Sequence, residues 1–182
     1  MSSSRRWKEP IPIVGMGVIT PYGSGVGTFA QALREGRSAI ESVTLLPFEE
    51  PRPAGLLPSQ SVAEWIAPVV EADPDLGKRL TKLLRRTPIA AALSTLVALE
   101  AWKDAGFGEE ESAPMGAVVG GHSLASSYEF GLREKFDASS HHLPPSFAVH
   151  LMDTDHVGVV SDLFQLHGPG FTVGGASASG QM

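Results

Sequence analysis

The chain has 182 residues, of which 42% are hydrophobic and 19% are charged, and this length and composition predict one compact domain. Its formal charge of −6 argues against a general nucleic-acid-binding protein, and the absence of cysteine excludes a disulfide framework, a cysteine-based zinc site and a cysteine nucleophile in this chain. No apolar run approaches the ~20 residues that cross a bilayer and no hydrophobic signal core is present, so we expect no membrane association and a cytoplasmic location.

The N-terminal part of the chain predicts a strand, a loop and a short helix. The apolar, β-branched run from Ile11 to Ile19 ends at Thr20-Pro21 and indicates a buried strand. Residues 28–35 indicate a short helix, with Gly36 as its stop signal. Four prolines between residues 38 and 58 exclude a long regular element and predict a surface excursion there.

The clearest helix of the sequence runs from Pro88 to Ala105. Thr87 can cap it, Pro88 fits its first turn, and apolar residues recur at helical spacing from Ile89 onward. Many of its other residues are alanines, which permit close packing, so we expect this helix to be largely buried.

Two further strands and one more helical stretch follow this helix. The runs 116–121 and 171–173 read as buried strands, and residues 149–166 have mixed helical spacing. We therefore expect an α/β layered fold in which Ile13–Ile19, Ala117–Gly121 and Phe171–Val173 share one sheet, with the helix packed on it.

Two further patterns are weaker indications of a nucleotide-binding site and of a metal site. The run from Gly15 to Thr20 begins like a dinucleotide-binding fingerprint, but it lacks the third glycine and no helix opens there, so we interpret its glycines as a means of close packing. The side chains of His150, Asp153, Asp155 and His156 are metal-ligand types, but their spacing scatters them around a helix. We favour a hydrogen-bonding or interface role for this acidic pair and predict no metal site.

The last segment is typical of a nucleophile turn. Gly175-Ala176-Ser177-Ala178-Ser179-Gly180 follows a strand and is close to the hydrolase pattern G-x-S-x-G. Small neighbours leave room for a substrate, and backbone N–H groups at such a turn can stabilise a developing oxyanion. The alternative is a run of small residues that only allows a helix to pack closely.

Four segments in chain order resemble one family, the β-ketoacyl synthases of the thiolase-like fold. They are the opening strand and loop at 13–23, the helix at 29–38, the alanine-rich helix at 85–107, and Gly168-Pro169-x-Phe171-Thr172-Val173-x-x-Ala176-Ser177-x-Ser179-Gly180, which is similar to the turn that presents the family's catalytic cysteine. The resemblance implies that residues 1–182 form the N-terminal domain of a thiolase-like α/β protein, since the family's synthases run to roughly twice this length. It also implies a homodimer, with the strands near 116–121 and 171–173 close to the two-fold axis. It implies no cofactor beyond the phosphopantetheine arm of an acyl carrier protein that brings the substrate.

Ser177 occupies the position of the family's cysteine, and the family's downstream histidines and lysine lie beyond Met182. A serine hydroxyl is hardly ionised at neutral pH, so acyl transfer should be crippled, whereas decarboxylation of a malonyl thioester needs only a stabilised enolate. This combination resembles the serine-bearing ketosynthase-like decarboxylases of polyketide β-branching cassettes, which supply acetyl-acyl carrier protein to a hydroxymethylglutaryl-type synthase. The resemblance implies that Ser177 shapes the pocket and lends its backbone N–H to the oxyanion, and that Ala176 and His122 contact the substrate.

Other readings remain open. The protein could be a catalytically silent partner subunit of the chain-length-factor type, or a condensing synthase whose cysteine has been replaced by serine. A serine hydrolase would need a histidine after the serine, and none remains in this chain. Because the enolate-stabilising donors that the resemblance implies lie downstream, we expect no turnover of malonyl-acyl carrier protein by these 182 residues alone.

Overall fold

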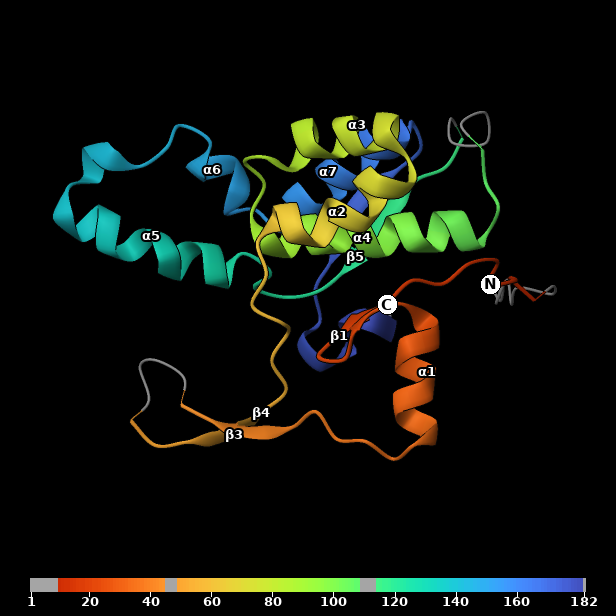
Figure 1. Cartoon of the computed structure of the whole chain (residues 1–182). Coiled ribbons are helices and arrows are strands. Elements are labelled where there is room, and N and C mark those ends of the chain that lie inside the picture. The colour runs from red at the N-terminus through yellow and green to blue at the C-terminus, as the bar shows by residue number, and fades with distance from the viewer. Residues whose placement is uncertain (1–9, 45–48, 109–113, 182) are drawn as a thin grey trace, which may run out of the picture.

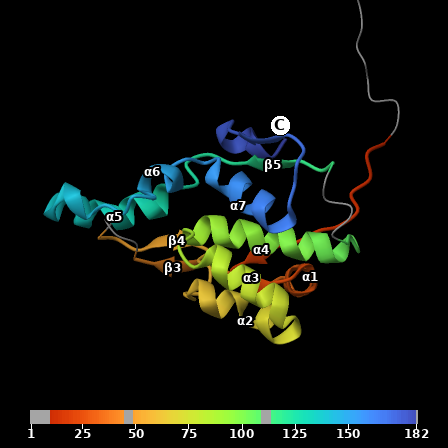
Figure 2. The ribbon, with the colours of Figure 1, turned by 90° about the horizontal axis from the view of Figure 1, so that it is seen from above.

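The computed structural model describes residues 10–44, 49–108 and 114–181, and its elements form layers around one central helix (Figures 1 and 2). In chain order the elements are β1 (Ile19–Thr20), β2 (Gly23–Ser24), α1 (Val26–Arg34), β3 (Glu41–Val43), β4 (Arg52–Ala54), α2 (Val62–Ala72), α3 (Pro74–Leu84), α4 (Ile89–Asp104), β5 (Ala117–Gly120), α5 (Ser126–Ala138), η2 (Ser140–His142), α6 (Phe147–His150), α7 (Asp155–Phe164), β6 (Gly170–Val173) and η3 (Ala176–Gln181). Figure 2 shows α4 between α7 and β5 on one side and α2 and α3 on the other, while α5 projects from these layers.

The central helix α4 confirms the predicted helix 88–105 and its burial. Leu80 of α3 is fully buried, and the same core cluster contains Ala92 and Leu99 of α4 and Leu163 of α7. The predicted cap was wrong, because the Thr87 hydroxyl donates to Leu83 O at 3.1 Å and thus closes the end of α3 instead. The core is therefore a helical sandwich with α4 at its centre.

Helices α2 and α3, which were not predicted, form a hairpin beside α4. Ser61 caps α2 through a reciprocal capping box with Glu64, and the hydrogen bonds from Ser61 lower the pKa of the Glu64 carboxyl. Asp73 then ends α2 and caps α3, accepting a hydrogen bond from Leu76 N at 3.1 Å. Both helices begin at local capping signals that are present in the sequence, namely Ser61-x-x-Glu64 for α2 and Asp73-Pro74 for α3.

Strands β5 and β6 confirm the two predicted strands of the C-terminal half, but their predicted burial was wrong, because Val118 is 57% and Phe171 49% exposed on one face of the pair. They pair in parallel, with Ala117 opposite Gly170 and Gly120 opposite Val173. Helix α7 lies between them in sequence and packs against both, so the unit is a β-α-β crossover. Both strands therefore end on the same edge of the sheet.

The predicted single sheet that included Ile13–Ile19 was wrong. Only Ile19–Thr20 forms a strand, and it pairs with β2 in a separate antiparallel hairpin. The preceding backbone lies on α4, where a Cβ on Gly17 would stand 2.1 Å from Val97 O. Its N–H groups at Met16 and Val18 donate to the carboxylates of Asp104 and Glu100, both at 2.9 Å. The glycines thus serve close packing, as predicted. The backbone N–H groups, however, bind carboxylates one helical turn apart on α4 instead of the carbonyl groups of a neighbouring strand.

The remaining N-terminal predictions agree with the structure. Helix α1 covers Val26–Arg34, and Gly36 follows it with φ of 64°, the left-handed conformation that a glycine stop provides. Between residues 38 and 58 the described residues form only the short antiparallel pair β3 and β4. No helix in the described part of the chain is long and apolar enough to span a membrane.

Candidate active site

The turn after β6, residues 174–181, forms a strained elbow. Ala176 has φ of 48°, a left-handed conformation that is costly for a residue with a Cβ. Ser179 holds it in place, because its buried hydroxyl accepts a hydrogen bond from Gly175 N–H at 2.9 Å and donates to Ala176 O at 2.8 Å. Within this elbow, Ala176–Gln181 form the 3-10 helix η3 and not an α-helix.

Small residues on β5 let this elbow lie against the end of the sheet. A Cβ on Gly120 would stand 2.6 Å from Ser179 O, so a side chain there would push the elbow away. The N–H of Gly121 donates to Val173 O at 3.0 Å and extends the parallel pairing into the loop. The elbow therefore lies at the carboxyl ends of two parallel strands, the edge where α/β folds bind ligands.

Ser177 lies on the exposed side of the elbow. Its side chain is solvent-exposed and forms no hydrogen bond with the described residues, in contrast to the buried Ser179 two positions later. The geometry thus separates the two serines, one of which braces the turn while the other is presented to solvent. Ala176, the other predicted residue of the elbow, is also exposed and supplies the left-handed step before Ser177.

His122 lies next to the start of the elbow. It follows Gly121 in the loop after β5, is exposed, and its Nδ1 is 3.9 Å from the point where a Cβ on Gly174 would stand. Ser123, the next residue, has φ of 55°. The structure therefore brings His122 and the elbow to the same sheet edge, although no hydrogen bond joins His122 to Ser177.

The predicted ligand-type cluster near α7 forms separate hydrogen bonds instead of a shared site. The Nδ1 atom of His150 lies 2.8 Å from the Asp155 carboxylate, and the Asp153 carboxylate accepts a hydrogen bond from Leu124 N–H at 2.9 Å. This agrees with the hydrogen-bonding role favoured for the acidic pair. Within residues 10–44, 49–108 and 114–181, no group of three or more His, Asp or Glu side chains could hold a metal ion.

Burial shifts the pKa of two groups around this cluster. The imidazole of His156 is buried against α4, where its Nδ1 lies 2.8 Å from Ser94 Oγ. Burial lowers the pKa of His156, although the nearby carboxylates of Asp155 and Asp153 act in the opposite direction. Burial and the charge of Asp155 both raise the pKa of Tyr128, whose ring packs edge-on against His150.

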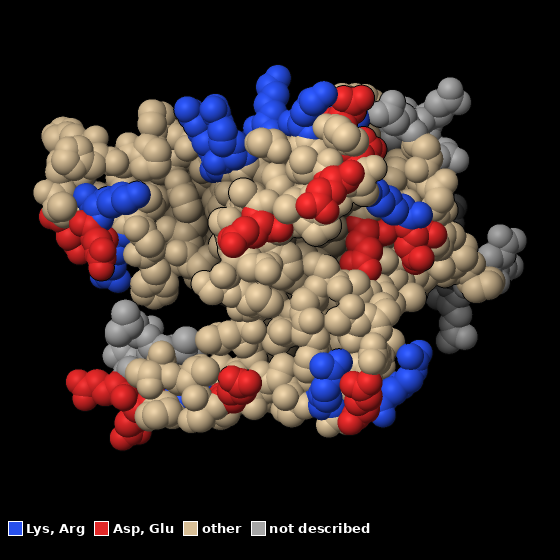
Figure 3. All heavy atoms as spheres, in the orientation of Figure 1, with Lys and Arg blue, Asp and Glu red and all other residues tan. Residues whose placement is uncertain are grey.

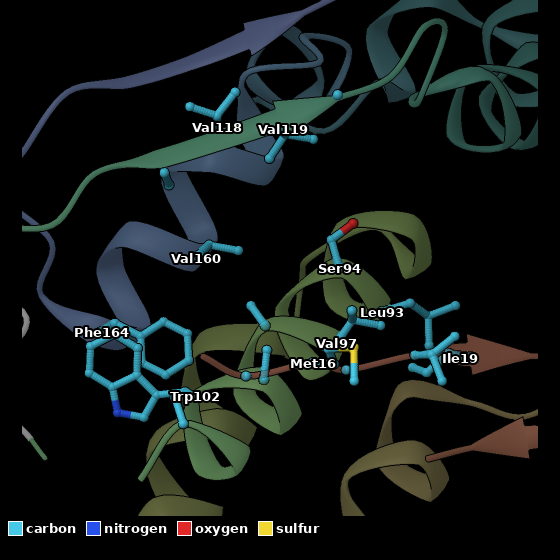
Figure 4. A pocket seen from close by; sticks show the side chains of 18 of the residues that line it. Met16, Ile19, Leu93, Ser94, Val97, Trp102, Val118, Val119, Val160 and Phe164 are labelled. Atoms are coloured by element: carbon cyan, nitrogen blue, oxygen red, sulfur yellow. The ribbon is translucent and has the colours of Figure 1, made fainter. Parts of the chain in front are cut away.

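A large hollow lies beside β5, whose last residue, Gly120, also packs against the elbow (Figure 4). Its volume is about 1140 Å³, and it is lined by the segment 14–19, α4, β5 and α7. Met16, Val97, Trp102 and Val119 give it a mostly apolar wall, and Ser94 contributes a hydroxyl. Neither Ser177 nor His122 lines it, so the hollow and the predicted site residues do not form one cavity. The Gly15 to Thr20 run borders this hollow and turns into β2, not into a helix, so it does not form a dinucleotide-binding turn.

Sequence comparisons show which family and which known proteins this chain is similar to. Residues 8–182 match the family described as "Beta-ketoacyl synthase, N-terminal domain". The chain is 30% identical over 173 residues to the "Polyketide biosynthesis malonyl-ACP decarboxylase PksF" of Bacillus subtilis (strain 168), covering 94% of this chain and 39% of that protein. It is 28% identical over 178 residues to the "3-oxoacyl-[acyl-carrier-protein] synthase 2" of Coxiella burnetii (strain RSA 493 / Nine Mile phase I), covering 95% of this chain and 40% of that protein.

Solved structures show the same fold. A β-ketoacyl synthase from Burkholderia phymatum STM815 matches with a TM-score of 0.63 at 22% identity over 93% of this chain and 40% of that one. The ishigamide ketosynthase/chain length factor matches with a TM-score of 0.62 at 21% identity over 89% of this chain and 39% of that one. The chain thus spans about 40% of the length of the curated relatives it matches.

Proposed function

Because the chain belongs to the β-ketoacyl synthase family and has the thiolase-like fold of its N-terminal domain, we propose that the complete protein is a ketosynthase-like decarboxylase. Its reaction converts malonyl-acyl carrier protein to acetyl-acyl carrier protein in polyketide biosynthesis. The observation that carries this proposal is the exposed hydroxyl of Ser177 on an intact elbow. A relative with 30% identity that is named as a malonyl-ACP decarboxylase supports it.

The chemistry of this reaction explains why decarboxylation does not need an ionised nucleophile at position 177. The bond between the malonyl carboxylate and the central carbon breaks, carbon dioxide leaves, and the electron pair moves onto the thioester oxygen as an enolate. A proton from solvent then reaches the central carbon and yields the acetyl thioester. No step needs a nucleophile, whereas condensation requires an acyl group to be transferred first to an ionised side chain.

The site residues have distinct roles in this proposal. The backbone N–H of Ser177 donates to the enolate oxygen, and its side chain shapes the pocket. Ala176 and His122 contact the substrate from the elbow and from the loop after β5, which meet at the same sheet edge. In this proposal the substrate arrives on the phosphopantetheine arm of its carrier, and the reaction needs no further cofactor.

The charge distribution supports an acyl carrier protein as the partner. Basic side chains gather along the upper edge of the molecule in Figure 3, which is the place of α3 in Figure 1. The last turn of α3 and the residues that follow it carry the exposed Lys82, Arg85 and Arg86. This surface complements an acidic carrier domain, although the chain as a whole has a formal charge of −6. We further propose a homodimer of the complete protein, a cytoplasmic location, and delivery of the product to a hydroxymethylglutaryl-type synthase.

Intact-protein mass spectrometry of the carrier tests the proposed reaction. The complete protein should convert malonyl-acyl carrier protein to acetyl-acyl carrier protein and form no condensation product. Ser177→Ala should retain most of this activity, because the backbone N–H survives the change. An acyl adduct on Ser177 that turns over at the rate of product formation, together with an inactive alanine variant, would contradict the proposed mechanism. Absence of decarboxylation in the unmodified complete protein would favour the silent partner subunit instead.

Charge reversal tests the carrier surface separately. The double variant Lys82→Glu and Arg85→Glu should raise KM for malonyl-acyl carrier protein at least several-fold while leaving kcat close to that of the unmodified protein. The control is Arg34→Glu at the end of α1, a helix that lies far from α3 in Figure 1, and it should leave KM unchanged. Equal effects of the control and the double variant would contradict docking on α3.

A further inference from the structure

The loop that follows β5, residues 121–125, carries His122 to the elbow and is held at both ends. At its start, a backbone hydrogen bond of 3.0 Å joins it to the end of β6. Near its far end, Leu124 N–H donates to the carboxylate of Asp153, 29 residues later in the chain, at 2.9 Å. Between these two points Ser123 has φ of 55°, a conformation that L side chains rarely adopt. Such a loop keeps its shape only while its surroundings hold it.

We propose that Asp153 is a positioning residue of the candidate active site. Its carboxylate holds Leu124 N–H and, through the loop 121–125, keeps His122 beside Gly174 at the start of the elbow. The bond has an ionised acceptor, so it is stronger than a neutral backbone hydrogen bond, and the Asp153 side chain is only partly exposed to competing water. The effect on turnover rests on the proposed function, whereas the placement of His122 is a property of the fold alone.

The neighbouring acid, Asp155, has a different structural role. It begins α7, and its carboxylate pairs with His150 of α6 at 2.8 Å, the two side chains being 9% and 13% exposed. Asp155 carries the same charge as Asp153 and is two residues away, but it holds α6 and not the loop that carries His122. Replacing either acid by a neutral residue removes one negative charge near the start of α7. Only replacement of Asp153 should also release the loop 121–125, so a variant of Asp155 controls for the loss of charge.

Two variants of Asp153 separate the hydrogen bond from the charge. Asp153→Ala removes the acceptor, so the Leu124 amide should exchange its hydrogen about 10- to 100-fold faster, the range expected for losing a bond to a charged group. Asp153→Asn keeps a side-chain oxygen that can accept the same bond, so exchange should stay within about threefold of the unmodified chain. The ring signals of His122 in NMR spectra should shift in the alanine variant and return in the asparagine variant. Asp155→Asn should leave both readouts unchanged.

The same variants test the effect on the reaction in the complete protein. Asp153→Ala should lower kcat for malonyl-acyl carrier protein about tenfold with little change in KM, and Asp153→Asn should restore it. If the alanine variant does not fold, Asp153→Ser replaces it, because serine keeps a polar group before α7 but is too short to reach Leu124. Unchanged His122 signals and unchanged Leu124 exchange in the folded variant would overturn the proposal, as would an unchanged kcat in a protein that decarboxylates. A complete protein without any decarboxylase activity would refute the proposed function alone, since the exchange and NMR measurements would still decide the role of Asp153.

Discussion

The shape of the elbow depends on one buried hydroxyl, and Ser179→Ala measures that dependence. The Ser179 side chain accepts from Gly175 N–H at 2.9 Å and donates to Ala176 O at 2.8 Å, in a residue that is 7% exposed. Alanine removes both hydrogen bonds and leaves a partly buried N–H without its acceptor, which costs about 1–3 kcal/mol. The φ of 48° at Ala176 adds stored strain of about 1–2 kcal/mol. The released turn should therefore relax toward ordinary backbone geometry.

Hydrogen exchange at the Gly175 amide reports this loss directly. A cost of 1–3 kcal/mol corresponds to exchange that is about 5- to 150-fold faster in Ser179→Ala. The matched control is Ser177→Ala, the same chemical change two residues earlier, where the side chain is exposed and has no hydrogen bond to the described residues. The control should stay within about 0.5 kcal/mol of the unmodified chain. Equal exchange at Gly175 in the two variants would refute the assignment of Ser179 as the brace of the elbow.

Three further predictions concern the stability of the fold. Leu80→Ala should lower the free energy of unfolding by about 2–5 kcal/mol in urea titrations, because this side chain is completely buried. Gly17→Ala should lower the free energy of unfolding by about 1–3 kcal/mol, because its Cβ would stand 2.1 Å from Val97 O. The control Gly27→Ala, whose Cβ would have nothing within 4 Å, should be neutral or slightly stabilising, and equal effects would contradict the close packing at Gly17. Burial lowers the pKa of His156 below its unfolded value of about 6.5, so the unfolded chain takes up the proton first. Stability should therefore fall as the pH drops below about 6.5, and His156→Gln should flatten this dependence between pH 7.5 and 5.

Local patterns in the sequence determined the central helix, the parallel strand pair and the elbow. The apolar spacing from Ile89 onward is a property of neighbouring residues, so it predicted α4 without knowledge of its partners. The runs 116–121 and 171–173 are short, apolar and bounded by glycines, which was enough for β5 and β6. The Ser61-x-x-Glu64 capping box is an equally local signal for the start of α2.

Only the tertiary structure decided which groups satisfy the N-terminal backbone and which residues hold the site. The run from Ile11 to Ile19 has the composition of a strand, but Glu100 and Asp104 of α4 accept its N–H groups across more than 80 residues of chain. The bond from Leu124 to Asp153 likewise joins two loops that no local pattern connects. Backbone N–H and C=O groups need hydrogen-bond partners wherever they are buried, and the sequence alone shows this need. The packing of distant elements decides which partners they find. For this reason the sequence predicted Ser177 and its turn, and the fold alone revealed what keeps that turn in place.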